Sequence, residues 1–120
     1  MPAYSFQAQF APLVESGEKR QTIRAIGKRR HAHPGERLQL YTGMRTKACR
    51  KLVTPDPVCT FAGSVYICHG IGSPAVTVED KGEVSPDAFA RADGFADFDA
   101  MLEWFEKTHG LPFVGVLIRW

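Results

Sequence analysis

Several stretches of the chain alternate apolar and polar residues, the period-two pattern expected of strands. Residues 4–10 show it first, with Tyr4, Phe6, Ala8 and Phe10 on one face and polar residues on the other. Later stretches rich in β-branched and aromatic residues predict further strands over residues 21–26, 37–42, 58–68, 75–79 and 113–120.

Other segments carry helix signals. A short helix is predicted to begin at Pro12 and to end at Gly17. Ser85 followed by Pro86 marks a second start, with an end near Gly94. The clearest element spans residues 95–109 and carries an apolar stripe at helical spacing, made of Phe95, Phe98, Met101, Leu102 and Phe105.

The order of these elements is β-α-β-β-β-β-α-α-β, without the regular βαβ repeat of a parallel doubly wound sheet. It predicts an α+β domain or a small β-barrel with helices on its outside. No internal repeat or low-complexity linker interrupts the chain, so residues 1–120 are expected to form a single domain.

Charge is distributed unevenly along the 120 residues, although the formal net charge is only +2. Residues 18–51 hold only Glu18 and Glu36 as acids, against a long series of cations: Lys19, Arg20, Arg24, Lys28, Arg29, Arg30, Arg37, Arg45, Lys47, Arg50 and Lys51. This asymmetry fits an electropositive surface that attracts phosphate. A solvated basic loop and strand explain it equally well.

The numbers and spacing of cysteines and histidines predict neither a disulfide framework nor a metal site. The three cysteines include no CxxC pair, so no disulfide framework is expected. His31, His33 and the Cys68-His69 pair match no zinc spacing, and we expect neither a metal nor another cofactor. No apolar run has membrane-spanning length and no signal-peptide pattern opens the chain, which predicts a cytoplasmic protein without a membrane partner.

The segment from Gly17 to Arg24 is the best candidate for chemistry. Lys19 and Thr22 lie three residues apart, and a basic group near a hydroxyl is one way to make threonine a nucleophile. In an extended strand that spacing would put them on opposite faces, so they can meet only if the chain is still turning after Gly17. Arg24 would share a face with Thr22. An exposed basic turn leading into a strand is the plainer interpretation.

Two further constellations have both functional and structural interpretations. Asp93-Gly94-Phe95 places a carboxylate at a helix end beside an aromatic, which is also ordinary helix punctuation. The segment from Tyr41 to Lys47 combines an aromatic ring with the cations Arg45 and Lys47, suited to stacking a base and holding phosphate. It would equally serve as a strand end followed by a basic hairpin loop.

Over nearly its whole length the chain resembles the ASCH domain, a branch of the PUA-like superfamily. The resemblance rests on the opening Phe6 to Phe10 stretch, Ser16-Gly17-Glu18-Lys19 with Thr22-Ile23-Arg24, Pro34-Gly35-Glu36, Asp93-Gly94-Phe95 and the closing helix and strand. It implies a small PUA-like β-barrel flanked by short helices, with a cleft that meets RNA or modified nucleosides.

Within that family the chain is most similar to small bacterial amidohydrolases of N(4)-acetylcytidine. The resemblance implies a catalytic set of Lys19, Thr22 and Asp93, with Asp93 where those enzymes carry a glutamate. We therefore expect removal of an acyl group from N(4)-acylated cytidine, with the substrate contacted by Arg24, Tyr41, Arg45, Lys47 and Phe95. The alternative is an RNA-binding or RNA-cleaving module that uses the same basic cleft, because family membership does not fix activity.

Overall fold

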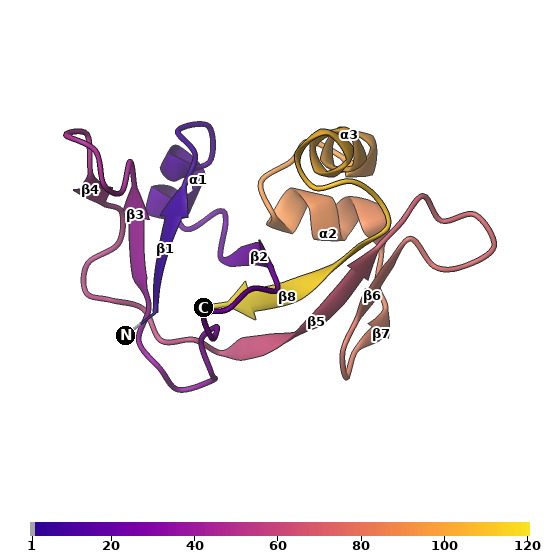
Figure 1. The fold of residues 1–120 in the computed structure, drawn as a ribbon, viewed down its shortest axis with the longest axis horizontal. Helices are drawn as coiled ribbons and strands as arrows, with labels where there is room; N and C mark the ends of the chain where they lie inside the picture. The colour runs from indigo at the N-terminus through magenta and orange to yellow at the C-terminus, as the bar shows by residue number, and fades with distance from the viewer. Residues whose placement is uncertain (1) are drawn as a thin grey trace.

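The computed structural model describes residues 2–120, in which eight strands form two sheets and three helices pack beside them (Figure 1). The strands are β1 (Ala3–Phe6), β2 (Gln21–Ala25), β3 (Gln39–Thr42), β4 (Arg50–Lys51), β5 (Phe61–Ile67), β6 (Val76–Val78), β7 (Gly82–Glu83) and β8 (Phe113–Arg119). The helices are α1 (Ala11–Ser16), α2 (Pro86–Ala92) and α3 (Phe98–Thr108). Among these residues no helix is long and apolar enough to cross a membrane.

The larger sheet is antiparallel and has the strand order β2-β8-β5-β6-β7. Strand β8 is second in this order. It pairs with β5 over the full length of both strands and with β2 on its other edge. Helices α2 and α3 lie over one face of this sheet (Figure 1). The apolar stripe of α3 points at the sheet, because Phe98, Met101 and Phe105 are buried with Leu117 of β8 in one hydrophobic cluster.

The smaller sheet has the order β1-β3-β4, with β1 parallel to β3 and β3 antiparallel to β4. Helix α1 lies beside it, next to β1 and β3 (Figure 1). A second hydrophobic cluster joins this sheet to the end of β8, with Tyr4, Phe6 and Leu40 packed together with Ile118 and Trp120. Strand β8 therefore contributes to both cores.

The two clusters meet at a pair of aromatic side chains, Phe95 and Trp104, which are half-buried and pack against both. Phe10 completes this junction through edge-on contacts, with ring centroids 5.3 Å from Phe95 and 6.0 Å from Trp104. The segment before β2 and the end of α2 also meet near this junction, where Lys19 contacts Asp93.

Comparison with the sequence-based expectations confirms the α+β class but not the barrel, because the two sheets of residues 2–120 do not close on each other. The predicted strand over residues 4–10 was wrong beyond Phe6. The carbonyl of Gln7 accepts hydrogen bonds from the backbone N–H groups of Phe10 and Ala11, so the chain turns there and enters α1. The two-residue strands β4 and β7 were not predicted, since neither is long enough to show alternation.

Candidate functional site

Lys19 is positioned by the turn between α1 and β2. Helix α1 ends at Gly17, which adopts a left-handed φ of 84° and donates its N–H to the carbonyl of Val14. The backbone N–H of Lys19 then donates to the carbonyl of Leu13 at 3.0 Å, and the strand begins only at Gln21. Because Lys19 precedes the strand, its side chain is not bound by the alternation that separates positions 19 and 22 in extended backbone.

The ammonium group of Lys19 is held by one residue, Asp93, which caps the C-terminus of α2. Its Nζ lies 2.5 Å from the backbone carbonyl oxygen of Asp93 and 3.2 Å from the carboxylate Oδ1. Gln21 donates its Nε2 to the same Oδ1 at 3.2 Å, and Arg119 Nε donates to Gln21 Oε1 at 3.2 Å. The side chains of Lys19 and Asp93 are only 4% and 7% exposed, so solvent hardly screens this pair.

Gly94 lets the chain turn away directly after Asp93. Its φ of +97° lies in the region that favours glycine. A Cβ at this position would stand 3.1 Å from the ring of Phe10 and 3.3 Å from the Cδ of Lys19. A side chain here would therefore press on the lysine as well as strain the backbone, which explains why the carboxylate is followed by glycine.

Thr22 and Arg24 lie on one face of β2, as their spacing predicted. Arg24 donates its Nε to Thr22 Oγ1 at 3.0 Å and one terminal nitrogen to the carbonyl of Ser5 at 3.0 Å. The guanidinium also lies over the rings of Tyr4 and Phe6, with its central carbon 5.0 Å from each ring centroid. Since Arg24 supplies the donor, the hydroxyl hydrogen of Thr22 is left to point elsewhere.

Burial shifts the proton equilibria of this cluster toward neutral groups. It lowers the pKa of Lys19 below its ordinary 10.5, against the opposing effect of the Asp93 carboxylate, and nearby Arg24 lowers it further. Burial likewise raises the pKa of Asp93 above its ordinary 3.8, although Lys19 and Gln21 oppose this. The lysine is therefore easier to deprotonate than an exposed one, which is what a general base requires.

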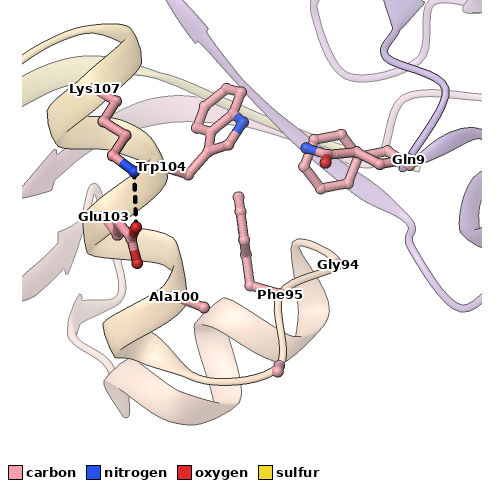
Figure 2. Close-up of a pocket in the computed structure, with 9 residues that line it drawn as sticks. Gln9, Gly94, Phe95, Ala100, Glu103, Trp104 and Lys107 are labelled. Carbon is pink, nitrogen blue, oxygen red and sulfur yellow. Dashed lines mark hydrogen bonds and ion pairs between the residues drawn. The ribbon is translucent and has the colours of Figure 1, made fainter.

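These groups open onto a pocket of about 240 Å³. Lys19, Thr22, Arg24 and Asp93 line it together with the polar residues Ser5, Gln7, Thr108 and His109. Much of its remaining wall is aromatic, with Phe6, Phe10, Phe95, Trp104 and Phe105. We call it the Lys19 pocket. A neighbouring pocket of about 370 Å³ shares the wall of Phe10, Phe95 and Trp104. Figure 2 shows this second space, with the Phe95 ring standing between Trp104 and Gln9 and with Lys107 turned toward Glu103.

The predicted site residues fall into two groups. Lys19, Thr22, Arg24, Asp93 and Phe95 all line the Lys19 pocket. The predicted substrate contacts at the end of β3 do not: Tyr41 is half-buried and pairs with β4, and Arg45 and Lys47 are exposed on the loop that follows.

Several members of the site were not predicted from the sequence, among them Gln21, Trp104 and His109. Gln21 bonds the catalytic candidate Asp93, and Trp104 lines both pockets. Trp104 could have been suspected, since it is a large aromatic on α3 next to the predicted apolar stripe, whereas nothing in the sequence marks Gln21.

Several cations of residues 18–51 are buried or paired. Lys19 is buried and Arg24 is largely so, and Arg30, Arg50 and Lys51 form ion pairs with Glu36, Glu15 and Asp56. Among the described residues, Lys28, Arg29, Arg45 and Lys47 are exposed and form no ion pair.

The described part of the chain contains no group of three or more His, Cys, Asp or Glu side chains arranged to hold a metal ion. No protein-family model, curated protein or solved structure matches the chain.

Proposed function

We propose that the protein hydrolyses the amide bond of N(4)-acylated cytidine and related N(4)-acylated cytosine nucleosides. The observation that supports this most is the buried Lys19 amine, held by Asp93 and lining the same pocket as the Thr22 hydroxyl. A desolvated lysine beside a threonine hydroxyl is a base and a nucleophile in one place. The aromatic wall of the pocket suits a planar pyrimidine, which can stack on it.

The first half of the proposed reaction forms an acyl-enzyme. Lys19 in its neutral form has two N–H groups and one lone pair, and its two N–H groups donate to the carbonyl and the carboxylate of Asp93. The lone pair takes the proton of Thr22, directly or through one water molecule. Thr22 Oγ1 attacks the acyl carbonyl carbon, and the C=O electron pair moves onto oxygen.

The intermediate then collapses and releases cytidine. The oxyanion re-forms the carbonyl, the bond from carbon to the exocyclic nitrogen breaks, and the Lys19 ammonium returns its proton to that nitrogen. A water molecule activated by the same lysine hydrolyses the threonine ester and frees the carboxylic acid. Arg24 contributes by donating to Thr22 Oγ1, which stabilises negative charge on that oxygen as the proton leaves.

The RNA-binding alternative has weaker support, because Arg30, Arg50 and Lys51 are neutralised by acidic neighbours and Arg45 and Lys47 lie outside the Lys19 pocket. We also propose that the chain belongs to the ASCH family, and with it that it has a PUA-like barrel.

Release of cytidine from N(4)-acetylcytidine, followed by ultraviolet absorbance, tests the proposal directly. We expect turnover by the unmodified chain and loss of turnover in Thr22→Val, which keeps the shape of the side chain without its hydroxyl. Thr22→Ser should retain part of the activity. Absence of cytidine release by the folded unmodified protein would refute the proposed function.

A further inference from the structure

A third pocket, of about 250 Å³, adjoins the Lys19 pocket at Arg24. Arg24 and Ala25 line both, so the two spaces meet at the end of β2. Arg29, Arg30, Tyr4 and His31 form much of the rest, and none of the residues that line it is acidic. We call it the Arg29 pocket.

The wall of the Arg29 pocket is held in place by hydrogen bonds. His31 Nε2 lies 2.9 Å from the carbonyl of Ala25 and therefore carries a hydrogen, while its Nδ1 lies 3.2 Å from the hydroxyl of Tyr4. That hydroxyl accepts the backbone N–H of Ala32 at 3.1 Å. The rings of His31 and Tyr4 stack with an interplanar angle of 15°, and Arg24 packs on the Tyr4 ring. Tyr4, His31 and Arg24 thus line the Arg29 pocket as packed planar groups, and Arg24 also lines the Lys19 pocket.

The charges of this pocket are not balanced. Arg30 forms a two-pronged ion pair with Glu36, with both N–O distances 2.7 Å, so its charge is largely answered. Arg29 is exposed and forms no ion pair or side-chain hydrogen bond among the described residues. The other pocket that adjoins the Lys19 pocket differs, because its only cation, Lys107, pairs with Glu103 at 2.8 Å (Figure 2).

We infer that the Arg29 pocket binds the phosphate group of the acylated nucleotide whose base lies in the Lys19 pocket. The substrate class is then a nucleotide or a nucleotide within a strand, rather than a free nucleoside. Arg29 supplies the free cation, and Arg30, oriented by Glu36, supplies further N–H donors. This inference rests on the proposed function for the base, but the phosphate site can be measured without turnover.

Binding of cytidine and of cytidine 5′-monophosphate, measured by calorimetry at low salt, provides the test. We expect the monophosphate to bind at least about tenfold more tightly, the scale of hydrogen bonds to a charged group. Arg29→Ala should remove most of that preference and Arg29→Lys should keep part of it. Lys28→Ala is the matched control, since Lys28 is an exposed neighbouring cation that does not line the pocket, and it should keep the preference.

Two further arms identify the source of the phosphate. Inorganic phosphate should compete with the monophosphate and not with cytidine. A dinucleotide carrying cytidine after a phosphodiester should bind better than the monophosphate if the natural ligand is a strand, and worse if it is a mononucleotide.

Equal binding of cytidine and its monophosphate would overturn the inference, as would equal losses in Lys28→Ala and Arg29→Ala. Failure of this inference is distinguishable from failure of the proposed function. If the protein cleaves N(4)-acetylcytidine but binds cytidine and its monophosphate equally well, only the inference about the Arg29 pocket is refuted. If the protein prefers the monophosphate through Arg29 but cleaves no N(4)-acetylcytidine, only the proposed amidohydrolase activity is refuted.

Discussion

Two ion pairs, one buried and one at the surface, illustrate how differently the same charges behave. Lys19 and Asp93 are enclosed, and burial moves the pKa of each toward its neutral form. Arg30 and Glu36 lie in solvent, where their contact has the opposite effect and lowers the pKa of Glu36 to about 2, raising that of Arg30. The surface pair is thus fixed in its charged state, whereas the buried pair can exchange a proton.

This difference indicates which pair is suited to the proposed chemistry. A buried ion pair contributes little net stability, because desolvation of the two charges offsets their attraction. Its position in the wall of a pocket that the Thr22 hydroxyl also lines is therefore a reason to test it for reactivity. The surface pair needs no such explanation, since it orients a loop at little desolvation cost.

The largest expected effect is on turnover. Lys19→Met and Thr22→Val should each lower kcat/KM for N(4)-acetylcytidine by at least about 10²–10⁴, the range for a general base. The double variant should be little worse than either single one, because members of a catalytic unit are not additive. Circular dichroism must show that each variant is folded. Full activity in folded Lys19→Met would eliminate the buried pair as the catalytic site.

The next effect is on stability. Asp93→Leu leaves the Lys19 ammonium buried without its carboxylate, and should lower the free energy of unfolding by about 3–5 kcal/mol. The double variant Lys19→Met with Asp93→Leu removes both charges and should recover much of that loss. Urea unfolding at neutral pH measures all three chains. Additive losses in the double variant would mean that the two charges are not coupled.

The third effect is a pH dependence of the reaction. Because burial lowers the pKa of Lys19, its basic form grows as the pH rises toward that lowered value, below 10.5. We expect kcat/KM to rise with pH over this interval and then to level off. Residual activity of Lys19→Met should lack the rise. A rate that falls as the pH increases would require the protonated lysine to be the active form.

Much of the fold could be predicted from the sequence because its signals are local. The stripe of α3, the Ser85-Pro86 start of α2 and the β-branched run of β5 each lie within one element. Sheet closure could not be predicted in this way. Whether β1 and β3 join β2 and β8 in a barrel depends on pairings between distant segments, which no periodicity records.

The candidate site shows the same difference between local signals and contacts of distant segments. Lys19 and Thr22 were found because both lie within five residues of a helix-ending glycine. Asp93 lies 74 residues from Lys19. The sequence marked it only as a carboxylate at a helix end, and its expected place beside Lys19 came from the family resemblance. Gln21 was missed because its role appears only when β8 brings Arg119 beside it. Arg45 and Lys47 were expected at the site on charge alone, and charge does not say where a loop points.

The smallest expected effect concerns the surface pair, and it tests the other half of the comparison. The folded pKa of Glu36, about 2, lies below its ordinary 4.5, so any stability from this pair is present above pH 4.5 and is lost as the pH falls toward 2. Glu36→Gln should therefore unfold at nearly the same urea concentration as the unmodified chain at neutral pH, with the small difference vanishing in acid. Salt should reduce that difference further, because exposed charges are screened. A loss in Glu36→Gln as large as that in Asp93→Leu would show that the loop over residues 29–36 is held by this pair, and the contrast between a buried reactive pair and a dispensable surface pair would fail.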